Sequence, residues 1–192
     1  MKRVLQNLPL KVKIALIVLL PMCGYLVSAG MNLVGTYTQY RSAETVAALV
    51  AFDGRISQLV HELQKERGAS SGFLASKGQK FVDILTNQRL ATDEKAAGYK
   101  SGLTDVEKAA GATLTEKIRQ AGTLLDELPI MRQKVTNQQI EPKDAIAYYT
   151  SFIAALLDLT SAISHLSDNA AITAQMFAYV HFLQSKERSG IE

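Results

Sequence analysis

The sequence contains few of the residues that brace small folds or build metal centres. Its 192 residues include no Trp, one Cys and four Pro. Because Cys23 is alone, an intramolecular disulfide and a cysteine-based metal site are excluded. Ala, Leu, Gln, Glu and Lys dominate, and β-branched runs are few beyond the N-terminus, which favours helices. No alternation of period two indicates strands, so we predict an all-α fold.

Acidic residues are absent from the first 40 positions, which carry four basic residues. The rest of the chain has 17 basic and 18 acidic residues, so the formal charge of +3 comes from the N-terminal arm. A nucleic-acid-binding domain usually carries a basic face on its folded part. We therefore expect no nucleic-acid partner.

Charged residues of either sign are absent from Ile14 to Tyr40. The apolar run from Ile14 to about Val34 reaches the roughly 20 residues that a membrane-spanning helix needs. We predict a basic cytoplasmic arm at 1–13, a transmembrane helix at 14–36 in the inner membrane of a bacterium, and a periplasmic remainder, because positive charge stays inside. A signal peptide cleaved near Ser28-Ala29-Gly30 is the alternative, although signal sequences have shorter apolar stretches.

Two smaller features of this N-terminal region indicate contacts at the membrane. Gly24 and Ser28 are small residues four apart, a spacing that lets two spans approach closely. We expect a homodimer. Lys11 and Lys13 could contact anionic lipid headgroups or phosphate on the cytoplasmic side.

Apolar residues spaced by three, four or seven after the span predict an antiparallel helical bundle, which we assign to a domain at 42–192. A turn is expected at 75–78, and Gly98 and Gly102 are expected to interrupt the second helix. The capping-box spacing of Thr104 and Glu107 predicts the start of a third helix, which Pro129 could kink. The other expected helices cover 42–67, 79–99, 141–166 and 168–188.

The tripeptide Lys-Glu-Arg occurs twice, as His61-Glu-Leu-Gln-Lys-Glu-Arg-Gly68 and within His181–Gly190. Arg67 and Arg188 fall on or beside the apolar stripes of their helices. A buried arginine needs an anion, because an unpaired buried charge is very costly. Since neighbours on a helix are about 100° apart, Lys65 and Glu66 are expected to point sideways if Arg67 points inward.

That anion is either a ligand or a carboxylate of the protein. Two converging guanidinium groups suit a small planar oxyanion, because the arginine fork matches its geometry and stays charged when desolvated. The alternative is a membrane-tethered structural or interaction bundle whose arginines pair internally, with Asp53, Glu62 and Asp158 as possible partners. The predicted ligand-binding residues are Arg67 and Arg188, with Gln64, Ser70, Ser71 and Gln184 as further donors.

Catalytic and metal-binding motifs were not found. His61, His165 and His181 lie on separate predicted helices, and the sequence has no paired histidine motif and no phosphate-binding loop. We therefore expect a protein that is not an enzyme and that carries no catalytic residue, no cofactor and no metal.

Several segments resemble the NIT domain, a nitrate- and nitrite-sensing module. The first is Leu59–Gly78, which contains the first Lys-Glu-Arg copy. It is followed by Phe81–Tyr99 with Gln88-Arg89 and Thr92-Asp93, by Leu125–Arg132, by Ile140–Leu157 with Tyr148-Tyr149, and by Leu183–Glu192. The resemblance covers about residues 45–192, with the motifs in the family's order.

The resemblance implies an all-helical sensor outside the cytoplasm in which core arginines hold nitrate or nitrite. Arg67 matches the arginine of the first motif, and Arg188 lies in the second. Family members place the module between two membrane spans ahead of a chemotaxis transducer, a histidine kinase or a cyclic-nucleotide enzyme, and soluble members regulate transcription. Because the sequence stops at Glu192, just after the second motif, we expect the sensor domain to be incomplete at its C-terminus.

Overall fold

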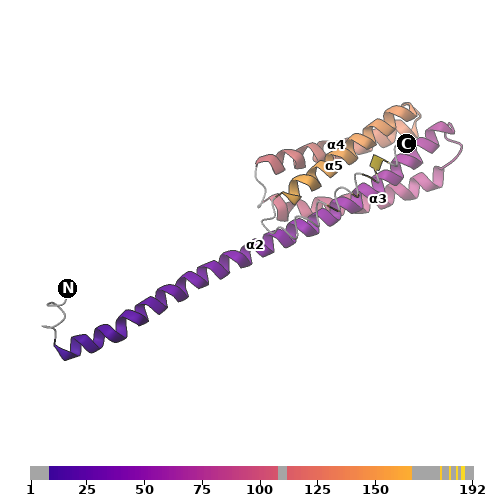
Figure 1. Ribbon diagram of the computed structural model, residues 1–192. Helices are drawn as coiled ribbons and strands as arrows, with labels where there is room; N and C mark the ends of the chain where they lie inside the picture. Colours follow the sequence, from indigo (N-terminus) through magenta and orange to yellow (C-terminus); the bar gives the residue numbers. More distant parts are fainter. Residues whose placement is uncertain are drawn as a thin grey trace. The chain divides into compact units, whose positions relative to one another are not determined.

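The computed structural model describes residues 9–107 and 112–165, together with Ala178, Phe182, Ser185, Glu187 and Arg188. Four helices follow one another, α2 (Leu10–Ala75), α3 (Val82–Glu107), α4 (Ala112–Thr136) and α5 (Pro142–Ser164) (Figure 1). No strand occurs in these described ranges, and the predicted all-α fold is confirmed. The chain divides into two compact units, Met1–Thr45 and Val46–Glu192.

The second unit is a helical bundle around one apolar core. The later part of α2 lies beside α3, α4 and α5, and each helix contributes fully buried side chains to the core (Figure 1). A smaller apolar cluster lies where the chain turns, and it includes Phe73, Leu85, Val135 and Ala145. The main core includes Leu59, Leu63, Tyr99, Val106, Ala121, Leu128, Phe152 and Leu156.

Helix α5 is the most apolar helix of this unit because it lies at the centre of the core. Tyr149, Phe152, Ile153, Leu156 and Leu159 are all completely buried. Of the described residues, α5 is also the one helix that is long and apolar enough to cross a membrane, with a mean hydropathy of 1.4. Since 44% of that stretch is buried inside the protein, its hydropathy is explained by core packing.

The predicted break at Gly98 and Gly102 is wrong, because α3 runs unbroken from Val82 to Glu107. Gly102 is buried, and a Cβ atom there would lie 2.7 Å from the Phe52 ring and 2.9 Å from the Arg55 guanidinium. Glycine at this position therefore allows α2 and α3 to approach closely. The predicted helix start at Thr104 is wrong for the same reason, since Thr104 lies inside α3.

The predicted turn at 75–78 and the predicted helix start at Glu141-Pro142 are confirmed. Helix α2 ends at Ala75, and Gly78 has a φ of 75°, a conformation that glycine adopts without strain. Glu141 is extended and precedes Pro142 at the first turn of α5, where a missing N–H costs no hydrogen bond. Pro129 lies within α4, which continues to Thr136.

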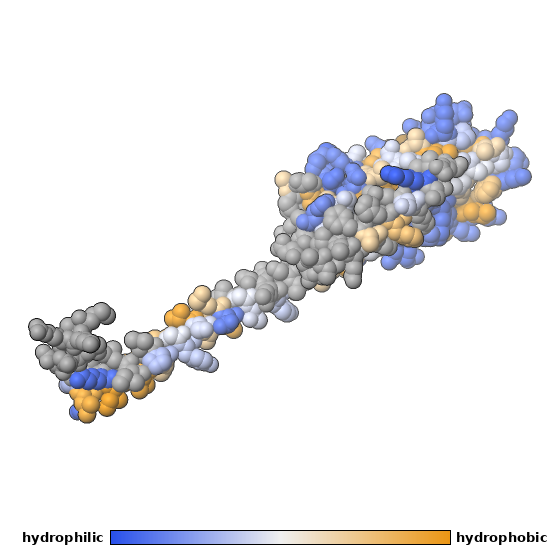
Figure 2. All heavy atoms as spheres, viewed as in Figure 1, coloured by the Kyte–Doolittle hydropathy of each residue, from blue (hydrophilic) through white to orange (hydrophobic). Residues whose placement is uncertain are grey.

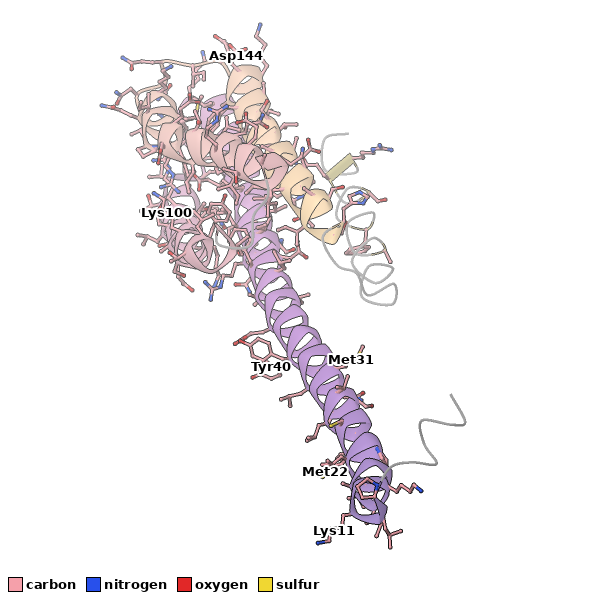
Figure 3. All side chains as sticks on the ribbon, turned by 90° about the vertical axis from the view of Figure 1, so that its left-hand side faces the viewer. Lys11, Met22, Met31, Tyr40, Lys100 and Asp144 are labelled. Carbon is pink, nitrogen blue, oxygen red and sulfur yellow. The ribbon has the colours of Figure 1, made fainter. Side chains whose placement is uncertain are left out.

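The first unit is the beginning of α2, and it exposes large apolar side chains. Met22, Tyr25, Val27, Met31 and Leu33 are each more than half exposed, and Cys23 is exposed as well. Apolar side chains follow this stretch in Figure 2, and Figure 3 shows Met22, Met31 and Tyr40 projecting outward from the helix. Several side chains of the predicted span at 14–36 lie outside the described part of the chain, and the span stays a prediction.

The predicted last helix, 168–188, lies mostly outside the described residues. The described positions Ala178, Phe182, Ser185, Glu187 and Arg188 are helical. Glu187 is buried, whereas Arg188 is exposed.

Candidate functional site

The polar site is built around the first Lys-Glu-Arg copy on α2. Along this stretch the buried face of α2 is wide, because it includes Glu62, Leu63, Glu66, Arg67 and Ser70. Glu66, which we expected to point sideways when Arg67 points inward, is completely buried, with 0% of its surface exposed to solvent. Neighbouring elements cover α2 over an arc broad enough to bury two residues that lie about 100° apart.

Arg67 forms a buried ion pair with Glu187 of the second Lys-Glu-Arg copy. Its Nη1 atom donates to Oε1 of Glu187, and its Nη2 atom donates to Oε2 at 3.4 Å. Nη1 also lies 3.0 Å from the hydroxyl of Thr150 on α5. The amide nitrogen of Gln64, one turn earlier on α2, donates to Oε2 of the same carboxylate at 2.7 Å. Two side chains of α2 therefore converge on one planar anion.

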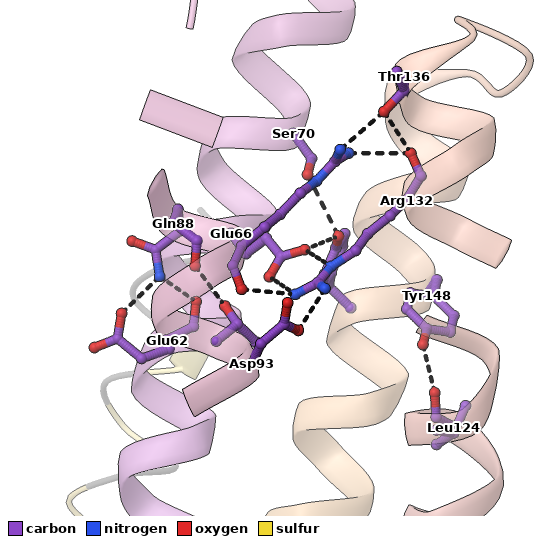
Figure 4. Close-up of polar contacts among 12 residues, drawn as sticks. Glu62, Glu66, Ser70, Gln88, Asp93, Leu124, Arg132, Thr136 and Tyr148 are labelled. Atoms are coloured by element: carbon purple, nitrogen blue, oxygen red, sulfur yellow. Dashed lines mark hydrogen bonds and ion pairs between the residues drawn. The ribbon is translucent and has the colours of Figure 1, made fainter. Parts of the chain in front are cut away.

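Glu66 points to a different set of partners, on α4 and α5. Arg132 binds its carboxylate in a bidentate manner, with Nε 2.7 Å from Oε1 and Nη2 2.9 Å from Oε2. The hydroxyl of Tyr149 donates to Oε1 at 2.9 Å. The Ser70 hydroxyl lies 3.4 Å from the Tyr149 oxygen (Figure 4). Complete burial raises the pKa of Tyr149, and the nearby Glu66 charge raises it further.

Arg132 also connects the network to α3. Its Nη1 atom lies 2.6 Å from a carboxylate oxygen of Asp93, and its Nη2 atom donates to the backbone oxygen of Arg89 at 3.3 Å. Burial alone would lower the pKa of Arg132, but the hydrogen bonds and charges of Glu66 and Asp93 outweigh burial and raise it. The arginine therefore stays charged inside the bundle and joins three helices.

Arg89 is the second guanidinium group of this network. It donates to the hydroxyl of Thr136 at 2.8 Å and to the backbone oxygen of Arg132 at 3.1 Å. Burial lowers the pKa of Arg89, the positive charge of Arg132 lowers it as well, and the negative charge of Glu66 offsets part of these effects. Arg89 and Arg132 thereby fasten α3 to α4.

Glu62 completes the polar layer on the α3 side. Gln88 donates to its carboxylate at 2.6 Å and to its backbone oxygen at 3.2 Å. Lys65 lies 3.0 Å from the same carboxylate. Although burial would raise the pKa of Glu62, the bonds from Gln88 and Lys65 lower it on balance.

The structure divides the predicted ligand-binding residues. Arg67 and Gln64 meet at the Glu187 carboxylate, as the preceding distances show, whereas Ser70 belongs to the Tyr149 group. Ser71 is partly buried, and Arg188 is exposed. Gln184 lies outside the described residues.

The internal partner of Arg67 is a carboxylate that the sequence did not single out. Glu62 is bound by Gln88 and Lys65, and Asp158 lies 3.6 Å from Lys117. Asp53 is buried in the apolar core, and burial raises its pKa to about 6, partly offset by the hydroxyl of Thr160. In the described part of the chain, the acid beside Arg67 is Glu187.

Other contributors were also missed as site residues, namely Glu66, Asp93, Arg132, Tyr149 and Thr150. A usable signal was present, because Asp93, Arg132 and Tyr149 lie in the segments whose order resembles the NIT domain. Those separate segments come together here in one polar network.

Comparison with known proteins decides the family. The sequence profile of the family described as "Nitrate and nitrite sensing" (NIT) matches residues 58–192. This chain belongs to the NIT family. The match covers the whole polar network, from Glu62 to Glu187.

Two related proteins are similar to most of this NIT chain. A nitrate regulatory protein of Klebsiella oxytoca is 31% identical over 139 residues, which is 72% of this chain and 35% of that protein. The solved structure of the NasR transcription antiterminator superposes with a TM-score of 0.76 at 27% identity, over 83% of this chain and 45% of that one. The chain thus spans less than half the length of either relative.

Proposed function

We propose that this chain is the sensing part of a membrane-anchored receptor that binds nitrate or nitrite in the periplasm. Membership of the NIT family supports the ligand class. The receptor would act as the input of a transmembrane signalling protein, such as a chemoreceptor or a sensor kinase. In this proposal the anion stabilises one arrangement of the bundle and thereby shifts a conformational equilibrium.

The observation that carries the proposal is the convergence of Arg67 and Gln64 on one carboxylate. That carboxylate presents two coplanar oxygens with a shared negative charge, and nitrate and nitrite present the same edge. Arg67 has only 6% of its surface exposed, so its charge requires an anion at this place. Its planar fork is suited to a planar oxyanion. We assign Arg67 and Gln64 to the anion, and we assign Ser70 to the supporting Tyr149 group.

The exposed apolar stretch at the beginning of α2 supports the membrane anchor. Ile14, Leu19, Met22, Leu26 and Met31 are each at least half exposed. Polar side chains of this stretch bond back to their own helix, since Asn32 donates to the Ser28 oxygen and Thr36 to the Asn32 oxygen. In a bilayer, polar groups must be satisfied in this way. The homodimer remains part of the proposal.

Calorimetric titration of the chain in lipid nanodiscs tests the ligand assignment. Sodium nitrate and sodium nitrite would be titrated separately, with sodium chloride at equal ionic strength as the reference. We expect saturable heat for the wild type and none for Arg67→Ala. Arg119→Ala is the matched control, because Arg119 is an exposed arginine paired with Glu116 one turn away. Equal heats for the wild type and Arg67→Ala would refute the assignment.

A structural bundle without a small ligand is the second candidate. The Arg67–Glu187 pair favours it, because this arginine already has an internal carboxylate partner. The same titration separates the two functions. The structural bundle would be supported if the folded wild-type chain gave no heat with nitrate or nitrite and Glu187→Gln, which removes the internal carboxylate, gave none either.

A further inference from the structure

We propose that Glu187 is an internal competitor of the sensed anion, which binds to Arg67 by displacing the Glu187 carboxylate. The inference rests on the proposed function and adds how the same site is regulated. In this view the contact between the two Lys-Glu-Arg copies breaks when the anion binds, and its loss is the signal that the anion is present.

The hydrogen-bond donors of the site are already used by Glu187. Arg67 donates to both of its oxygens, and Gln64 donates at 2.7 Å to Oε2. Glu187 brings only acceptors, and it is 7% exposed. A carboxylate and a nitrate ion make the same demand on a guanidinium fork, namely two coplanar donors for two coplanar oxygens. The two anions are therefore alternatives at one place.

Charge balance leads to the same conclusion. The guanidinium of Arg132, the partner of Glu66 in the polar network, is already engaged by Glu66 and Asp93. If a monovalent anion joined Arg67 while Glu187 stayed, two negative charges would share one positive charge in a buried place. Like charges that close disfavour each other strongly. An exchange of one anion for the other preserves the local balance.

The position of Glu187 in the chain makes the exchange feasible. Its residue lies beyond Ser164, the end of α5, whereas the partners of Glu66 lie on α4 and α5 within the core. A displaced Glu187 carboxylate can regain hydration in solvent, which offsets the loss of its pair. Displacement of Glu66 would instead leave Arg132 and Tyr149 without their buried partner inside the bundle. The competitor is thus the carboxylate whose release leaves the core intact.

The test is nitrate titration of Glu187→Gln against the wild type, in nanodiscs by calorimetry. The amide has the size of the carboxyl group but lacks its charge, so it competes poorly for a guanidinium. Removing an internal competitor raises the fraction of sites that are open, and we expect binding about tenfold tighter or more. Glu141→Gln is the matched control, because it makes the same chemical change at an exposed residue.

A second measurement uses the unaltered protein. Amide hydrogen exchange of the peptide that contains Glu187 should become faster when nitrate is added to the wild type, because displacement of the Glu187 carboxylate would release this peptide from Arg67 on α2. Exchange of the α5 peptide around Tyr149 should not become faster. Slower or unchanged exchange of the Glu187 peptide at saturating nitrate would contradict displacement.

The outcomes separate this inference from the proposed function. Tighter binding by Glu187→Gln but not by Glu141→Gln supports competition, including the case in which the wild type binds too weakly to measure. Wild-type binding that Arg67→Ala abolishes, with equal or weaker binding by Glu187→Gln, overturns competition and leaves the proposed function standing. No nitrate binding by either the wild type or Glu187→Gln overturns both.

Discussion

In the first Lys-Glu-Arg copy both Glu66 and Arg67 are buried, whereas in the second copy Glu187 is buried and Arg188 is exposed. The first copy lies on α2, which neighbouring elements cover over a wide arc, so adjacent charges reach different partners. The second copy supplies its acid to the arginine of the first. The same tripeptide therefore does not determine which charge turns inward. The elements around each copy determine it.

The largest effect should come from removing the acid of the first copy. Glu66→Ala leaves the guanidinium of Arg132 and the hydroxyl of Tyr149 without their buried partner. Breaking a buried pair in this way costs about 3–5 kcal/mol. Urea unfolding of the detergent-solubilised chain, followed by circular dichroism, measures the loss. Glu116→Ala, which removes an acid from an exposed pair, should change the midpoint little, and a similar loss in both variants would contradict the buried network.

The second largest loss of stability should separate variants of the two arginines, Arg67 and Arg188. Arg67→Ala removes the cation of the Glu187 pair, and because the freed Glu187 carboxylate can regain hydration, we expect a loss of about 1–2 kcal/mol in the same assay, less than for a charge that stays buried without a partner. Arg188→Ala removes an exposed side chain and should leave the unfolding midpoint almost unchanged. Equal losses would show that the copies are equivalent and that the difference in burial has no energetic consequence.

Asp53 sharpens the comparison, because among the described residues this buried acid has no arginine partner. Burial raises its pKa from 3.8 to about 6, so the folded state holds the proton more tightly than the unfolded state. Proton binding by Asp53 therefore makes its full contribution to the free energy of unfolding below about pH 4, and this contribution is lost as the pH rises through about 6. Asp53→Asn should therefore stabilise the protein by about 2–3 kcal/mol at pH 7.5, and the gain should vanish as the pH falls below about 4. A gain independent of pH would contradict the raised pKa.

The bundle could be predicted because apolar spacing reports which face of a helix is buried. The glycines of α3 could not be interpreted in this way. A glycine that ends a helix and a glycine that lets two helices touch look alike in sequence. The deciding fact at Gly102 is the position of Phe52 and Arg55 on another helix.

The sequence predicted only those parts of the candidate site that can be read from the periodicity of a single helix. The stripe that runs through Leu63 indicated that Arg67 points inward, and Gln64 lies beside it. The burial of Glu66 depends on Arg132 and Tyr149, and the partner of Arg67 comes from Glu187, far along the chain. Pairings between distant segments have no local periodicity, so the resemblance to a family carried information that the spacing of residues did not.

Nitrate titration of Arg67→Lys tests the central claim most directly, because lysine keeps the charge and removes the planar fork. We predict saturable nitrate binding by the wild type in nanodiscs, with an affinity about tenfold or more below it for Arg67→Lys. Arg119→Lys, the same change at an exposed arginine, should bind as the wild type does. Equal nitrate affinity for the wild type and Arg67→Lys would contradict the assignment of Arg67 as the residue that holds the anion.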